Sequence, residues 1–70
     1  MQYEYDLELV GSLKVGEECY FAECEGSAGR IVREGDMYLL YSIPMYGGEE
    51  RFESASKSYV ELVDLYYSFT

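Results

Sequence analysis

Residues 2–9 alternate strictly between polar and apolar side chains, and this pattern constrains the fold more than any other feature of the chain. The apolar set, which would share one face of an extended strand, is Tyr3, Tyr5, Leu7 and Leu9. The polar set, which would share the other face, is Gln2, Glu4, Asp6 and Glu8. A period of two is typical of a strand with one buried face. We therefore predict a strand over residues 2–10.

Turn-forming residues divide the middle of the chain into further short extended runs. The runs that we predict as strands are residues 18–25, 30–34 and 37–43, with another over 49–53 in a five-stranded version. The connections are rich in glycine, which supplies the unusual backbone dihedrals of turns. The run over 37–43 is the most apolar, which indicates a central strand with both faces partly covered. Pro44 should end it, because proline cannot donate to the ladder.

The C-terminal segment has a helical pattern over residues 58–68. Ser58 and Glu61 have the S-x-x-E spacing of a capping box, which marks the start of a helix. Beyond it, only Glu61, Asp64 and Ser68 form a polar stripe, so most of the helix should be buried. A helix of about 10 residues does not persist alone in water, and we expect it to pack on the sheet.

Together these elements predict an α+β fold. The sheet would be small, twisted and antiparallel, with four or five strands in a meander and the C-terminal helix packed on one face. A chain of 70 residues is expected to form a single domain over 1–70, and its apolar fraction of 49% is enough for a core. The apolar strand and helix would leave surface uncovered, which favours a homodimer or a docked partner.

The charge balance restricts the class of partner. The chain carries 14 acidic and 5 basic residues, a net charge of −9. Phosphate binding depends on lysine and arginine, so we expect no direct nucleic-acid binding and no anionic membrane surface as a partner. A protein partner with a basic surface is favoured. With neither a leader-like start nor an apolar run of about 20 residues, and with two free thiols, a cytoplasmic location is expected.

Catalysis and metal binding are disfavoured by the residue types present. The chain has no histidine, so the usual base near neutral pH is missing and nothing of that kind can activate Cys19 or Cys24. Its short acidic clusters do not match a calcium loop, and two cysteines cannot complete a structural zinc site. We expect a binding protein with no catalytic residue, no metal and no cofactor.

The main candidate site is the acidic side of the predicted first strand. Alternate residues on a strand lie about 7 Å apart, similar to neighbouring phosphates along DNA, and Glu4, Asp6 and Glu8 have this spacing. Glu23 and Glu25 could add a second row. In size and charge the chain then resembles DNA-mimicking inhibitors from phages and mobile elements, which implies an inhibitor or adaptor acting on a nucleic-acid-handling protein. The alternative is that these acids are solvated positions of an edge strand.

A second candidate lies around the predicted loop after Pro44. Tyrosine and arginine are favoured at binding hot spots, and binding residues gather on loops. Tyr46 and Arg51 are the expected anchors, with Tyr41 and Tyr67 as further candidates. A function of another class also fits: a small homodimeric structural or regulatory protein, whose acidity gives only solubility.

Overall fold

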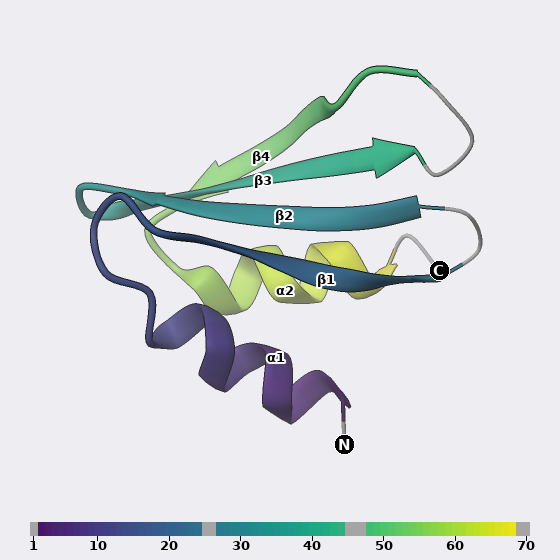
Figure 1. The fold of residues 1–70 in the computed structure, drawn as a ribbon. Helices are drawn as coiled ribbons and strands as arrows, with labels where there is room; N and C mark the ends of the chain where they lie inside the picture. Colours follow the sequence, from purple (N-terminus) through teal and green to yellow (C-terminus); the bar gives the residue numbers. More distant parts are fainter. Residues whose placement is uncertain (1, 25–26, 45–47, 69–70) are drawn as a thin grey trace.

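The computed structural model describes residues 2–24, 27–44 and 48–68, with the backbone alone for residues 2, 22–24 and 27. The elements, in chain order, are α1 (Gln2–Gly11), β1 (Glu18–Cys24), β2 (Ser27–Glu34), β3 (Met37–Pro44), β4 (Arg51–Ser56) and α2 (Tyr59–Ser68) (Figure 1). No helix in these described ranges is long and apolar enough to cross a membrane.

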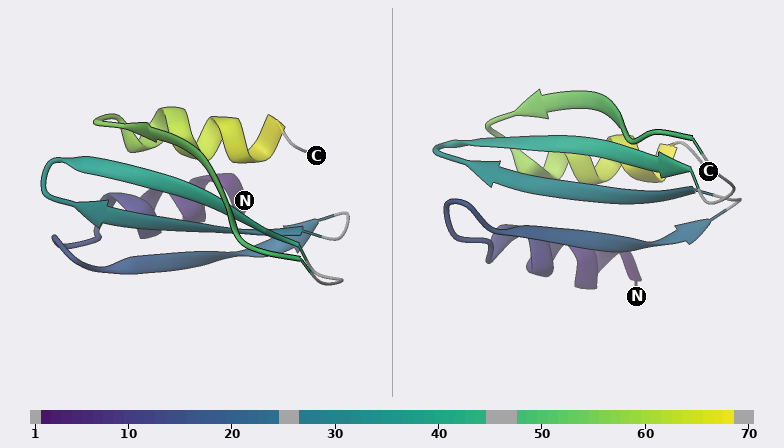
Figure 2. Two further views of the ribbon diagram at one scale, coloured as in Figure 1. Left: turned by 90° about the horizontal axis from the view of Figure 1, so that it is seen from above. Right: turned by 45° about the horizontal axis from the view of Figure 1, so that its top comes forward.

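The four strands form one antiparallel sheet in the order β1-β2-β3-β4, which confirms the predicted meander. β2 and β3 are joined by a two-residue turn, in which Gly35 takes a φ of +62° that side-chain-bearing residues rarely adopt. Both helices lie on the same side of the sheet (Figure 1, Figure 2). The α+β fold with a C-terminal helix on the sheet is therefore confirmed.

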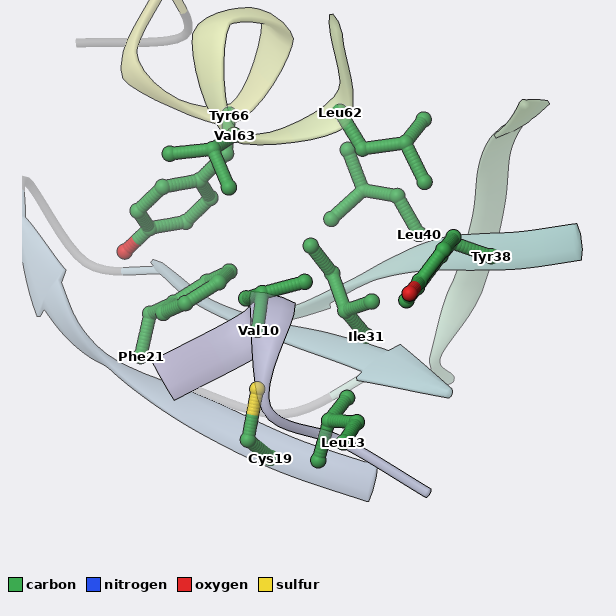
Figure 3. Packing of buried hydrophobic residues seen from close by; sticks show 10 residues of the cluster. All are labelled: Val10, Leu13, Cys19, Phe21, Ile31, Tyr38, Leu40, Leu62, Val63 and Tyr66. Atoms are coloured by element: carbon green, nitrogen blue, oxygen red, sulfur yellow. The ribbon is translucent and has the colours of Figure 1, made fainter. Parts of the chain in front are cut away.

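The core fills the space between this face of the sheet and the two helices. Leu62 and Tyr66 of α2 point toward Leu40, Ile31 and Phe21 of the sheet (Figure 3). The Tyr66 and Phe21 rings lie 4.9 Å apart between centroids. The other buried apolar residues are Val10, Leu13, Cys19, Tyr38 and Val63. Ten buried side chains from the N-terminal, middle and C-terminal parts of the chain thus meet in one cluster.

The prediction of a strand over residues 2–10 is wrong, because these residues form helix α1. Tyr5, expected in the core, is 61% exposed, whereas Asp6, expected in solvent, is 2% exposed. Residues four apart lie on the same face of a strand, which has a period of two, and close to the same face of a helix, which has a period of 3.6. The alternation therefore could not distinguish a strand from a helix. Glutamate, glutamine and leucine favour a helix, and α1 packs on α2, with Val10 buried in the core.

Other boundaries shift by a few residues. β2 begins at Ser27 rather than residue 30, and β4 covers Arg51–Ser56 rather than 49–53. α2 begins one residue after the predicted cap. Ser56 supports this helix start, because its hydroxyl accepts a hydrogen bond from the Ser58 N–H and donates one to the Glu61 carboxylate.

Candidate functional site

The predicted acidic stripe does not exist as one surface. Glu4 and Glu8 are exposed and lie one turn apart on the same side of α1. Asp6 is buried and accepts a hydrogen bond at 2.5 Å from the Tyr67 hydroxyl of α2. Because a helix turns neighbouring side chains by about 100°, the spacing of about 7 Å expected on a strand does not apply. Asp6 is a structural residue at the α1–α2 contact.

Of the remaining predicted site residues, Arg51 is the one whose side chain the structure describes. Glu23 lies in β1, where its backbone alone is described, and Glu25 and Tyr46 lie outside the described residues. Arg51 is exposed and pairs with Ser42 at the start of β4. Since neighbouring residues on a strand point to opposite faces, Arg51 does not share the face of Phe52.

A different set of residues meets on the face of the sheet opposite the helices. Strand pairing sets Tyr20 opposite Arg30, Arg30 opposite Tyr41, and Tyr41 opposite Phe52. Each of the four strands thus contributes one residue to a single row. A second row on the same face consists of Glu18, Val32, Leu39 and Ala55. We call these two rows the open face, because no helix or strand of the described ranges covers it (Figure 1).

Arg30 is the centre of the open face. Its guanidinium carbon lies 4.6 Å from the centroid of the Tyr41 ring, a cation–π distance. Its Nε and Nη2 donate to the two oxygens of Glu50 at 2.7 and 2.6 Å, and its Nη1 donates to Glu18 at 2.5 Å. The bidentate bond from Arg30 lowers the pKa of Glu50, and the same bonds raise the pKa of Arg30 despite partial burial. One cation therefore holds two carboxylates, and the cluster keeps an excess negative charge.

Aromatic rings lie on both sides of this cluster. Tyr20 and Phe52 are each 59% exposed, at the two ends of the first row. The Phe52 ring meets the Tyr41 ring edge to face, with 5.7 Å between centroids. The half-buried Val32 and Leu39 form an apolar floor beside them. Exposed aromatic rings around a fixed arginine are typical of a protein-binding surface.

The described cysteine thiol is unsuited to nucleophilic chemistry. Cys19 is a free, buried thiol on the inner face of β1. Burial, and next the negative charge of Asp6, raise the pKa of Cys19 to about 11. A thiol with this pKa is protonated near neutral pH and is a poor nucleophile. Within residues 2–24, 27–44 and 48–68, no three histidine, cysteine, aspartate or glutamate side chains are grouped so as to hold a metal ion.

Of the open-face residues, the sequence interpretation named Tyr41 alone. The missing information was which of two alternating sets on each strand faces the helices. The signal was present in part: the apolar residues Cys19 and Phe21, Ile31, and Leu40 mark the inner face of β1, β2 and β3. The register between these strands then assigns Tyr20, Arg30 and Tyr41 to the other face. No known protein family, curated protein or solved structure matches the chain.

Proposed function

We propose that this protein is an acidic protein-interaction module that binds a partner rather than catalysing a reaction, and that the open face is its docking surface. The observation that carries the proposal is the row of Tyr20, Arg30, Tyr41 and Phe52 on the face that the helices leave uncovered. Tyrosine and arginine dominate binding hot spots, since each combines large contact area with hydrogen-bonding groups.

The charge of the chain supports a partner with a basic surface. The net charge is −9, and the Arg30 cluster contributes more negative than positive charge to the open face. Opposite potentials speed encounter and exclude partners of like charge. A basic protein surface is therefore favoured over a second copy of this chain.

The narrower form of the proposal is an inhibitor or adaptor, of the phage or mobile-element type, that occupies the basic groove of a nucleic-acid-handling protein. Its support is the acidity of the chain; the regular acidic spacing that first suggested DNA mimicry is not part of it, because Asp6 is buried. A cytoplasmic location belongs to the same proposal and is supported by the free thiol of Cys19.

A second candidate function is self-association through the same surface. Its support is the apolar floor formed by Val32 and Leu39. The sheet of a second copy could cover this floor in a β-sandwich, in which two sheets lie about 10 Å apart. Sedimentation velocity at micromolar concentration separates the two candidates. A monomer supports a foreign partner, whereas a stable dimer whose formation requires Phe52 supports self-association.

Capture of the partner with matched variants tests the docking surface. The test variant is Tyr20→Ser with Phe52→Ser, and the control is Tyr5→Ser with Val60→Ser, which removes two exposed apolar side chains from the helices. We expect the control to retain the basic protein that wild type captures and the test variant to lose it. Retention by the test variant, at unchanged thermal stability, would contradict the proposal.

A further inference from the structure

We infer that the partner contacts the open face through arginine side chains, which stack on Tyr20 and Phe52 beside the carboxylates of Glu18 and Glu50. The inference rests on the proposed function and adds the chemistry of the contact. The chain already holds one guanidinium group of its own, that of Arg30, on this surface.

Arg30 shows the kind of ligand that this surface accommodates. Its guanidinium lies over an aromatic ring, that of Tyr41, and makes a bidentate bond to one carboxylate and a single bond to another. Its side chain is only 19% exposed, although both described helices, α1 and α2, lie on the other side of the sheet (Figure 1). The forked hydrogen bond to a carboxylate is a geometry that arginine can make and lysine cannot, and a guanidinium group can stack on an aromatic ring as well.

Two positions in the same row as Arg30, one next to it on β1 and one beyond Tyr41 on β4, repeat part of this arrangement. Tyr20 follows Glu18 by two residues on β1, so both point to the open face. Phe52 follows Glu50 by two residues at the start of β4. Both rings are more than half exposed, in contrast to the half-buried Tyr41 that Arg30 covers.

Charge complementarity favours cationic groups at these positions. Arg30 is bonded to both Glu18 and Glu50, so the cluster has one positive against two negative groups. An anionic partner side chain would add to this excess. A second copy of the chain would bring a further net charge of −9, and its own negative cluster would face that of the first copy. An arginine-bearing surface supplies both the charge and a planar group for the exposed rings.

The test compares two defined probes, capped hexa-arginine and capped hexa-lysine peptides, which have equal charge. Affinities of the full chain are measured by calorimetry at physiological salt, and the binding site is located by amide chemical shifts. Three proteins are compared: wild type, Tyr20→Leu with Phe52→Leu, and the control Tyr5→Leu, which removes a ring of similar exposure from α1. Leucine keeps an apolar side chain at each site, so the fold should be retained.

We expect wild type and the Tyr5→Leu control to bind hexa-arginine at least about threefold more tightly than hexa-lysine. The largest shifts should fall on Tyr20, Arg30, Tyr41 and Phe52, and the double variant should lose the preference. Equal affinity for the two peptides in wild type, a preference that survives in the double variant, or shifts centred on Glu4 and Glu8 would overturn the inference. If the preference is absent while the Tyr20→Ser, Phe52→Ser protein still loses its natural partner, the arginine inference fails and the docking surface stands.

Discussion

The Tyr67 hydroxyl of α2 donates a hydrogen bond at 2.5 Å to Oδ2 of Asp6 in α1, which ties together two segments that are 61 residues apart in the chain. The reciprocal bond runs from the Tyr3 hydroxyl of α1 to Asp64 of α2. The Tyr3 and Tyr67 rings also meet edge to face, with 5.3 Å between centroids. Two tyrosine–aspartate pairs thus fix α1 against α2.

The two pairs should differ in their effect on stability. Tyr67→Phe keeps the ring and removes the donor to the buried Asp6, so it should lower the free energy of unfolding by about 1–3 kcal/mol. Tyr3→Phe should cost less, because the acceptor Asp64 is exposed and water can replace the lost bond. Urea unfolding measures both, with Tyr5→Phe as the unaffected control. A larger loss for Tyr3→Phe than for Tyr67→Phe would contradict this account.

The raised pKa of Cys19 predicts a loss of stability at alkaline pH. The thiol has a pKa of about 11 in the folded protein, whereas an unfolded thiol has a pKa of about 8.5. Between these values the unfolded chain releases the proton first, so the free energy of unfolding should fall as pH rises, by up to about 3 kcal/mol. Chemical unfolding from pH 8 to 11 in a Cys24→Ser background measures the slope. The same series with Cys19→Ala should be flatter; an equally steep series would assign the effect to other groups.

Gly29 is expected to be needed for the packing of α2 on the sheet. A Cβ added there would lie 2.7 Å from the ring of Tyr66 and 3.1 Å from that of Phe21. Gly29→Ala should therefore lower the free energy of unfolding by about 1–3 kcal/mol through overpacking. In a Tyr66→Leu background the cost should shrink, because the clashing ring is gone. A cost that is the same in both backgrounds would contradict the proposed clash.

Arg30→Gln should release the carboxylate of Glu50. The bond from Arg30 lowers the pKa of Glu50, so the variant should return that pKa toward the ordinary carboxyl range. A lowered pKa contributes stability above the unfolded value of about 4.3 and loses it as pH falls through the folded value. Protonation of Glu50 at low pH should therefore reduce the free energy of unfolding by less in Arg30→Gln than in wild type. Carboxyl carbon NMR titration measures the pKa directly.

The matched control for that change is Lys57→Gln. Lys57 pairs with Asp36 at 3.4 Å, and both side chains are exposed. Removing this cation should leave the Glu50 titration unchanged. A Glu50 pKa that stays low in Arg30→Gln, or one that rises equally in both variants, would show that Arg30 is not its cause.

The sequence predicted the sheet and the last helix better than the first element. Strands around Ile31 and Leu40 are bounded by turn residues, and β3 includes Pro44, one residue beyond the predicted end. The S-x-x-E spacing of Ser58 and Glu61 located the start of α2 to within one residue, although in the structure the Glu61 carboxylate accepts a hydrogen bond from the Ser56 hydroxyl. For residues 2–10, Gly11 and Ser12 mark where the element ends but not whether it is a strand or a helix, and that depends on a contact with α2, far away in sequence. Tertiary contacts of this kind override a local pattern.

The candidate site was harder to predict for the same reason. A strand would align Glu4, Asp6 and Glu8 on one face, whereas the helix buries Asp6 and leaves the other two exposed. Tyr20, Arg30 and Phe52 come from three strands, and only the register between strands places them in one row. Register depends on all turns and bulges of the sheet, including the irregularity between Leu40 and Tyr41.

The most direct test of the docking surface is photo-cross-linking from a benzoyl-phenylalanine placed at one position at a time. Position 52 probes the open face, and position 5 probes α1 at similar exposure. In extract from cells that naturally produce the protein, we expect position 52 to give an adduct with one basic protein and position 5 to give none. Adducts from position 5 alone, or an adduct of two copies of this chain from position 52, would contradict the claim that the open face binds a basic partner.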